Sequence, residues 1–257
     1  MPGALTELGH KLDLLAAHAW PALETVIRDG WWLRYNEGLH RRVNSVLPES
    51  NGIKRLTDKL AEAEAFYRAH NLLPRFQVSP NCYPIDLDEV LAARGYEIES
   101  GVDIMITEIE DLAALQYADT EVWLDTKISQ NWIDVHMADA IDPNQKIRKA
   151  RMLERITPSH VFASALHNGR TVAAGLGIAD SGWLGIFGMF TLSENRRGGH
   201  GHAILAALAD WSLAQGARQA YLQVERGNPP AIAFYHRAGF RTVHGYHYRT
   251  LWDRPND

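Results

Sequence analysis

A glycine-rich stretch of the chain carries the residues best suited to bind a phosphate group. It reads Arg196-Arg197-Gly198-Gly199-His200-Gly201-His202, follows an apolar segment at 188–191, and runs directly into a helical pattern that ends at Gly216. A glycine-rich turn between a strand and a helix presents unpaired backbone N–H groups at the positive end of the helix dipole. Glycine also lets the backbone approach an anion closely, because it has no Cβ. The stretch therefore predicts a phosphate site.

Two other interpretations compete for this turn. A dinucleotide-binding fold requires Gly-x-Gly-x-x-Gly, but Gly199-His200-Gly201 is followed by Ile204 where the third glycine belongs. An isolated glycine cluster is also compatible with a flexible, solvated loop. The segments that follow favour neither interpretation. They read as a strand, a stop signal and a short helix closed by glycine: 221–224, Asn228-Pro229-Pro230, 231–238 and Gly239-Phe240.

The two motifs together resemble those of the GCN5-related N-acetyltransferases, the GNAT family. Arg196-x-x-Gly199-x-Gly201 is similar to the pyrophosphate loop of that family. Asn228 and the run Ala231-Ile232-Ala233-Phe234-Tyr235-His236-Arg237-Ala238-Gly239-Phe240 are similar to its second motif, Asn-x-x-Ala-Ile-x-x-Tyr-x-x-x-Gly-Phe. The resemblance implies an N-acetyltransferase that moves an acetyl group from acetyl-CoA to the primary amine of a small molecule or a peptide.

The resemblance also implies a role for individual residues. Backbone groups at the end of the strand before the loop are expected to meet the pantetheine arm and the thioester oxygen. The loop amides are expected to hold the pyrophosphate, Asn228 to bond the pantetheine arm, and Tyr235 to protonate the departing thiolate. The implied cofactor-binding residues are Met189, Phe190, Thr191, Arg196, Arg197, Gly198, Gly199, His200, Gly201, His202, Asn228 and Tyr235.

The general base stays open at this level. Some members of the family carry a glutamate where this chain has Gln223, and an amide cannot take a proton near neutral pH. Glu225 shares a strand face with that position and is the candidate we name, while Glu194, a bound water or an acceptor that arrives neutral are alternatives. The missing glutamate leaves a second function class open, an acyl-CoA-binding regulatory module without turnover. Only Tyr235 favours the enzyme.

The elements around these motifs predict a mixed α/β fold. Residues 108–124 and 133–156 are helical in pattern, and Trp123 and Trp132 flank an early region that lines the acceptor pocket in GNAT proteins. Two tryptophans are also compatible with core positions. A hairpin, 161–166 with 171–179, and a strand at 183–191 follow. The resemblance implies a mixed, mostly antiparallel GNAT sheet flanked by helices.

The first half of the chain weakly repeats a sequence pattern of the second half. Residues 76–78 and 87–96 parallel 222–224 and 231–240, but Leu91 stands in the place of the tyrosine and no glycine-rich loop precedes the helix. We therefore expect a smaller, degenerate GNAT-like α/β half. The predicted domains are 1–105, this degenerate half, and 106–257, the catalytic domain.

Local patterns in the first half predict helices at 5–27 and 53–70 and a hairpin of two strands, 31–35 and 40–46. Strand alternation would put Arg42 and Asn44 on one face, where a guanidinium beside a carboxamide suits an acceptor with a carboxylate or phosphate. An alternative is that these polar side chains face solvent.

Composition narrows the partners. The 257 residues include 26 basic and 31 acidic side chains, a net charge of −5 with no long single-sign run, so neither nucleic acid nor membrane is expected as a partner. Cys82 is the only cysteine, so we expect a cytoplasmic protein. No histidine cluster has metal spacing, so we expect no metal site. We further expect a monomer or homodimer.

Overall fold

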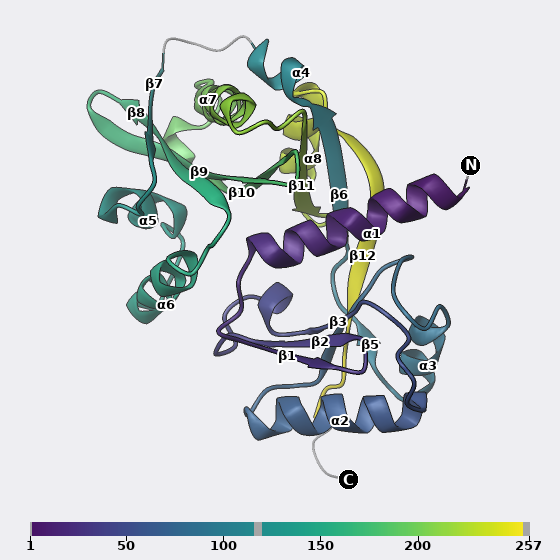
Figure 1. Cartoon of the computed structure of the whole chain (residues 1–257). Coiled ribbons are helices and arrows are strands. Elements are labelled where there is room, and N and C mark those ends of the chain that lie inside the picture. The colour runs from purple at the N-terminus through teal and green to yellow at the C-terminus, as the bar shows by residue number, and fades with distance from the viewer. Residues whose placement is uncertain (1, 116–119, 254–257) are drawn as a thin grey trace. The chain divides into compact units, whose positions relative to one another are not determined.

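The chain divides into two compact units (Figure 1). The computed structural model describes residues 2–115 and 120–253. Unit 1 is Met1–Asp103 with Glu225–Gly227 and His244–Asp257, and unit 2 is Ile104–Val224 with Asn228–Val243. The predicted division after residue 105 lies close to the first boundary. It assigned 225–227 and 244–257 to the other domain, however, because a single cut in the sequence cannot describe a chain that returns to its first unit.

The sheet of unit 2 is mixed and mostly antiparallel, as predicted. β10 pairs antiparallel with β9 and parallel with β11, and the helix α7 (His200–Ala214) connects the parallel pair. The strand order is β6-β11-β10-β9-β8-β7. The strands are β6 (Val102–Glu108), β7 (Glu121–Asp125), β8 (Ser159–His167), β9 (Arg170–Asp180), β10 (Trp183–Thr191) and β11 (Gln219–Glu225).

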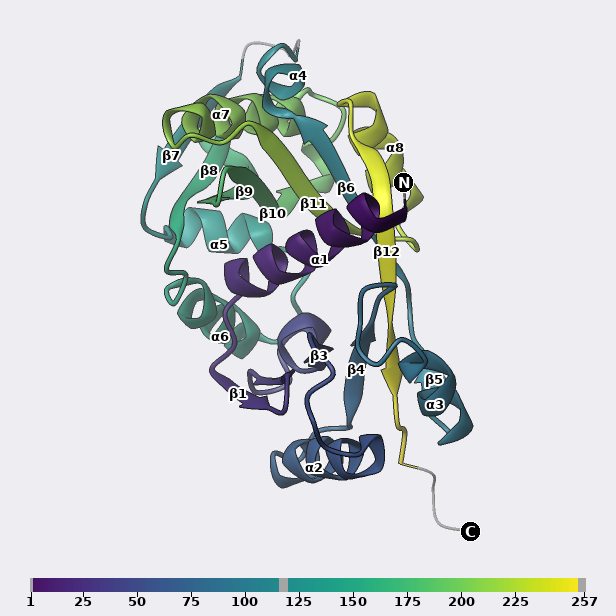
Figure 2. The same ribbon diagram turned by 45° about the vertical axis from the view of Figure 1, so that its right-hand side comes forward.

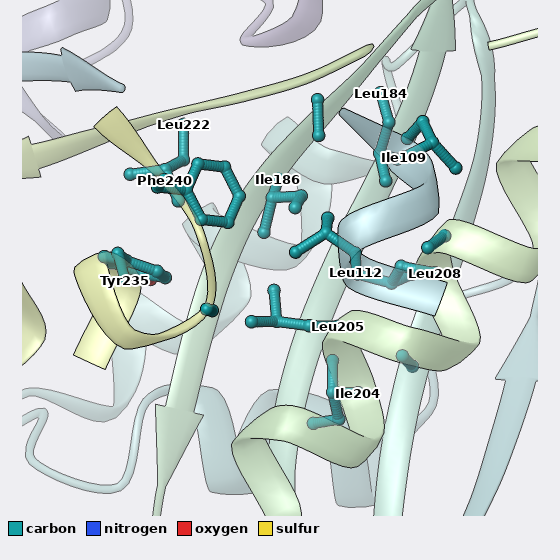
Figure 3. Packing of buried hydrophobic residues seen from close by; sticks show 14 of the residues in the cluster. Ile109, Leu112, Leu184, Ile186, Ile204, Leu205, Leu208, Leu222, Tyr235 and Phe240 are labelled. Carbon is teal, nitrogen blue, oxygen red and sulfur yellow. The ribbon is translucent and has the colours of Figure 1, made fainter. Parts of the chain in front are cut away.

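Helices cover both faces of this sheet. Figures 1 and 2 show α7 on one face and α5 on the other. Strand alternation explains the division, because Ile186 of β10 points into the cluster under α7 while its neighbour Phe187 points away from it. In Figure 3, Leu205 of α7, Leu112 of α4 and Tyr235 of α8 gather over that same face. The helices are α4 (Ile109–Ala113), α5 (Gln130–His136), α6 (Pro143–Leu153), α7 (His200–Ala214) and α8 (Pro229–Arg237).

Unit 1 has its own sheet and its own core. Its core combines Trp31 and Phe76 of the sheet with Tyr67 of α2 and Leu91 of α3, all at most 1% exposed. β1, β2 and β3 are antiparallel neighbours, β3 and β4 are parallel, and β4 and β5 each pair antiparallel with β12. The elements are α1 (Pro2–Ala19), β1 (Glu24–Arg28), β2 (Trp31–Tyr35), β3 (Val46–Pro48), α2 (Leu56–Ala69), β4 (Arg75–Val78), α3 (Leu87–Ala93), β5 (Glu97–Ile98) and β12 (Arg241–Thr250).

The two units repeat one connectivity. In each, three antiparallel strands are followed by a helix, a strand parallel to the third, and a second helix: β1-β2-β3-α2-β4-α3 and β8-β9-β10-α7-β11-α8. The second helices end alike. Gly95 and Gly239 have φ of +85° and +89°, and the N–H of the aromatic residue after each donates to a carbonyl inside the helix, Tyr96 to Leu91 and Phe240 to Tyr235, both at 3.0 Å. This likeness supports the predicted degenerate repeat.

Two predictions in the first half are wrong. The first helix ends at Ala19, and β1 takes the residues after Pro21, because Thr25, Val26 and Ile27 are β-branched and pair with β2 across a tight turn at 29–30. The expected second strand at 40–46 is a short 3₁₀ turn, Arg41–Val43, followed by β3. The face shared by Arg42 and Asn44 therefore does not exist.

The predicted helix at 108–124 is also mostly wrong. Only α4 is helical, and β7 occupies 121–125 as an antiparallel partner of β8. Its residues 116–119 lie outside the described part of the chain.

Candidate functional site

The parallel strands β10 and β11 are hydrogen-bonded to each other over only the first part of their length. Pairing of β10 with β11 runs from Trp183 with Gln219 to Ile186 with Leu222, whereas β10 continues to Thr191 and β11 to Glu225. A bulge interrupts β10 between Phe187 and Phe190, where its register with β9 shifts, and Gly188 has a φ of +59°. Bulges re-aim backbone groups and are common next to active sites. The last residues of β10 thus offer backbone donors and acceptors outside the ladder with β11.

The N-terminus of α7 has features that favour binding of an anion. Its N-cap is Gly199, with a φ of +83°, and no side chain caps the helix. No acidic residue lies in the first turn of the helix, where the positive end of the helix dipole favours an anion. By contrast, Ser129, Asp142 and Asn228 cap α5, α6 and α8 with their side chains. Of these four helices, α7 alone has no side-chain cap among the described residues, and a pyrophosphate fits the chemistry of its first N–H groups.

The loop before α7 is closely packed around its backbone. Arg196 folds over it, with Nε donating to the Thr191 carbonyl at 3.2 Å and the guanidinium 6.0 Å from the Phe190 ring centre. A Cβ at Gly198 would lie 2.9 Å from the His200 ring, and one at Gly201 would lie 3.0 Å from Phe234. The positive φ that only glycine adopts easily therefore belongs to Gly199, while Gly201 is required for close packing.

The remaining loop residues supply charge and shape. Arg197 has a φ of +68° and an exposed side chain. Burial lowers the pKa of His200 and of His202, with His167 and Arg237 as the second causes, so both rings are neutral near pH 7. His202 stacks on Phe234 with ring centres 4.8 Å apart. Attraction for an anion therefore comes from the amides and arginines rather than from imidazolium groups.

Asn228 and Tyr235 both belong to α8. The Asn228 side-chain oxygen accepts from the N–H of Ala231 at 3.2 Å, which leaves its NH₂ group to donate elsewhere. Tyr235 is 9% exposed and packs with Phe240, and burial raises the pKa of its hydroxyl to about 12. A phenol with that pKa carries its proton at physiological pH, as a general acid must. The core-aromatic alternative is also met, because the ring belongs to the main cluster of unit 2.

The carboxylate of Glu225, the candidate base, forms an ion pair with an arginine. Arg41 donates to the Glu225 carboxylate at 2.6 Å and to the Glu99 carboxylate at 3.1 Å, all within unit 1, and the Glu225 side chain is 57% exposed. Gln223, where some GNAT proteins have glutamate, has both side-chain amide atoms buried without a hydrogen bond to another described residue. Buried amide atoms in this condition usually bind a water or a ligand.

The structure corrects the acceptor residues predicted from sequence. Trp132 is fully buried, and its indole N–H donates to the carbonyls of Ala163 and Gly175 at 3.1 and 2.9 Å, so it is a core residue. Asn44 is 1% exposed and organises the loop around it. Its side chain accepts from the N–H groups of Asn36 and Gly38 and donates to the carbonyls of Leu39 and His40.

The other two acceptor candidates differ from these. Trp123 lies on β7 and is 57% exposed, which keeps it available for a ligand. The Arg42 guanidinium is 5.6 Å from the ring centre of Trp20. The roles of Trp123 and Arg42 stay predictions.

Sequence reasoning missed His136 and Gly188. The His136 Nδ1 donates to the Gly188 carbonyl at 3.0 Å, and burial lowers the pKa of this histidine to about 3, with Lys149 as the second cause. No local signal in the sequence links residues 52 positions apart. The two glycines of the mostly apolar strand 183–191, Gly185 and Gly188, were the available hint, since a glycine inside a strand suggests a bulge.

In unit 1, the loop before α2 corresponds to the loop before α7 in unit 2. Its backbone amides are hydrogen-bonded to a carboxylate of the chain itself. The Asp29 carboxylate accepts from the N–H groups of Ile53 and Lys54 at 2.9 and 3.0 Å, just before α2. These hydrogen bonds, Ile53 first, lower the pKa of Asp29. A Cβ at Gly52 would lie 2.2 Å from Asp29. The ammonium group of Lys59, 3% exposed, donates to the carbonyls of Asp29 and Asn51. The Asp29 carboxylate thus takes the place at these backbone N–H groups that a bound anion would need.

Within 2–115 and 120–253, no group of three or more His, Cys, Asp or Glu side chains is placed to hold a metal ion. No helix in the described part of the chain is both long and apolar enough to cross a lipid bilayer.

Comparison with protein families places almost the whole chain in one of them. The family described as "Probable histone acetyltransferase Rv0428c C-terminal" matches residues 10–249. The chain is 28% identical over 252 residues to the uncharacterized N-acetyltransferase YobR of Bacillus subtilis, a match that covers 93% of this chain and 97% of YobR. It is 26% identical over 239 residues to the probable histone acetyltransferase Rv0428c of Mycobacterium tuberculosis, covering 92% of this chain and 72% of that protein.

Solved structures share the fold. A GCN5-related N-acetyltransferase from Kribbella flavida superposes with a TM-score of 0.70 at 17% identity, covering 95% of this chain and 96% of its own. A tandem GNAT protein of the clavulanic acid biosynthesis pathway gives 0.62 at 16% identity, covering 77% and 69%. Together with the family match, these likenesses establish that the chain belongs to the Rv0428c C-terminal family and is an acetyltransferase of the GNAT type.

Proposed function

We propose that the protein transfers an acetyl group from acetyl-CoA to the primary amine of a small molecule or peptide by direct attack, with Tyr235 as the general acid. One observation carries the proposal. The uncapped, glycine-initiated N-terminus of α7 follows the strand whose bulged end leaves its ladder, so a phosphate site and free backbone groups belong to consecutive segments of unit 2.

The chain would hold acetyl-CoA with backbone more than with side chains. The amides of residues 197–202 and the arginines beside them hold the pyrophosphate. Backbone groups of Met189, Phe190 and Thr191 meet the pantetheine arm and the thioester oxygen, and the Asn228 NH₂ donates to the arm. When bound, acetyl-CoA supplies an activated acyl group as a thioester.

The chemical step requires attack of the amine on the acyl carbon and two proton transfers. The neutral amine forms the new C–N bond to the acyl carbon as the C–S bond breaks. Tyr235 gives its proton to the sulfur, and the proton lost by the amine goes to Glu225 or to water. The raised pKa of Tyr235 keeps the phenol protonated before the reaction, and the thiol formed afterwards needs no further charge stabilisation.

The test measures coenzyme A release from acetyl-CoA with a panel of amines, comprising polyamines, amino sugars, free amino acids and lysine-containing peptides. Turnover above the rate without acceptor, with the acetylated product identified by mass, is the expected result. A protein that binds acetyl-CoA but acetylates none of them would favour the second candidate function.

That second candidate is an acyl-CoA-binding regulatory module without turnover. Two observations favour it: Gln223 cannot act as a base, and the Glu225 carboxylate is paired with Arg41. Under this alternative, acetyl-CoA binds, but none of the amines releases coenzyme A above the rate without acceptor. Binding and turnover assays on the same preparation separate the two functions.

Fewer observations support the class of the acceptor than support acetyl-CoA as the donor. One relative is named a probable histone acetyltransferase, which supports including basic peptides in the panel. Of the acceptor contacts expected from sequence, Trp123 and Arg42 remain our candidates. Arg42→Ala is expected to raise KM for the acceptor with little change in acetyl-CoA affinity, as a lost binding contact does. An unchanged KM with a lower melting temperature would assign Arg42 a structural role.

A further inference from the structure

The helix α5 brings two aromatic rings to the bulge of β10. Trp132 and His136 lie four residues apart, on the same side of α5, with ring centres 4.8 Å apart. The Trp132 indole is fixed by its hydrogen bonds to carbonyls of β8 and β9. Its ring also packs edge-on against Phe162, at 5.1 Å. Because Trp132 is held by two neighbouring strands, the His136 ring that packs on it has a defined place.

His136 reaches the bulge through a directional contact. Its Nδ1 lies 3.0 Å from the Gly188 carbonyl oxygen, and a carbonyl can only accept, so Nδ1 carries the proton. With Nδ1 protonated in a neutral ring, the imidazole is a fixed donor over the physiological pH range, because burial keeps its pKa near 3.

Gly188 is shaped to fit these rings. A Cβ there would lie 3.3 Å from both the His136 and the Trp132 rings, and the φ of +59° disfavours any other residue. The contact determines where the Gly188 carbonyl points. A peptide unit is planar, so a carbonyl held at one residue also fixes the N–H of the next, Met189.

We propose that His136 is a positioning residue for acetyl transfer: by holding the Gly188 carbonyl, it orients the backbone of residues 189–190 toward the thioester. This inference rests on the proposed function, in which that backbone meets the thioester oxygen. His136 itself touches neither the acyl group nor the acceptor. Its effect passes through one peptide unit.

The test compares two substitutions of His136. In His136→Asn, the side-chain NH₂ takes the place of Nδ1 and can still donate to Gly188. In His136→Phe, the ring and its packing on Trp132 are kept, but the donor is lost. Titration calorimetry with acetyl-CoA and with coenzyme A measures the ratio of the two affinities, which depends on the acyl end of the ligand.

We expect His136→Phe to weaken acetyl-CoA binding on the order of tenfold, as for loss of one buried hydrogen bond, and coenzyme A binding by less than about threefold. His136→Asn should keep the wild-type ratio. An equal loss for both ligands together with a lower melting temperature would make His136 merely structural and overturn the inference. So would an unchanged ratio in a folded His136→Phe.

Two outcomes are kept separate. If the wild-type protein binds neither ligand, the proposed function fails before His136 is tested. If His136→Phe does not fold, His136→Gln takes its place, because a Gln amide donates from the position of Nε2 and cannot reach Gly188. A wild-type ratio in His136→Gln would then overturn the inference.

Discussion

At the scale of single residues, Tyr235 carries the most specific chemical assignment. Burial raises the pKa of its hydroxyl to about 12, so the phenol carries its proton at physiological pH. We expect Tyr235→Phe to keep its packing with Phe240 and to lower kcat on the order of 10²–10⁴-fold, as for a lost general acid. Pre-steady-state measurement of acetyl transfer checks this. A rate within about threefold of wild type, with chemistry rate-limiting, would leave Tyr235 as a core aromatic.

His136 makes a separate prediction about stability. Its pKa is about 3 in the folded chain and 6.5 ordinarily, so between these values the unfolded state binds the extra proton. The neutral, buried ring thus contributes stability that is complete above pH 6.5 and is lost as pH falls. The loss relative to His136→Asn should be about 1.4 kcal/mol per pH unit. Urea unfolding of both proteins at pH 7, 6 and 5 measures it, and parallel curves would contradict it.

At the scale of elements, α7 offers a matched pair of glycines. Gly199 at its start and Gly216 after its end both have a φ of +83°. Alanine at either position should destabilise the fold by about 1 kcal/mol, because both force a left-handed conformation. Only Gly199→Ala should weaken coenzyme A binding, since only Gly199 belongs to the proposed phosphate site. Equal affinities in the two variants would contradict that placement.

A second substitution in α7 tests close packing. Gly201→Val should abolish coenzyme A binding, because its side chain would push against Phe234 and distort the first turn. Calorimetric titration of the folded variant is the measurement. Unchanged affinity would exclude this turn as the phosphate site.

The elements also show what the sequence could predict. Glycine, proline and capping signals act locally, so the phosphate loop, α8 and the strand at 183–191 were recognisable. Elements whose stability comes from distant partners were not, as β1 and β7 show: each reads as part of a helix until its antiparallel neighbour is present. The same reason hid the roles of Trp132 and His136, whose hydrogen-bond acceptors lie 31 to 52 residues away along the chain.

At the scale of the whole molecule, the two units repeat one connectivity, but the described residues place a carboxylate on the amides of the loop before α2 and no side-chain cap on the start of α7. The fold class and the degenerate character of the first half follow from the chain's sequence, whereas Asp29 as the group that fills the loop does not. We expect one coenzyme A per chain. Titration calorimetry and native mass spectrometry give the stoichiometry, and a second equivalent bound would contradict it.

Because Asp29 is covalently part of unit 1, its hold on the amides of Ile53 and Lys54 does not depend on any solute concentration. Those amides should exchange slowly with deuterium whether or not coenzyme A is present. In the described part of the chain no side chain caps the amides of His200, Gly201 and His202, and their exchange should slow only as coenzyme A is added. Unit 1 therefore carries its own counter-anion, whereas under the proposed function unit 2 takes one from solution, as the pyrophosphate of coenzyme A.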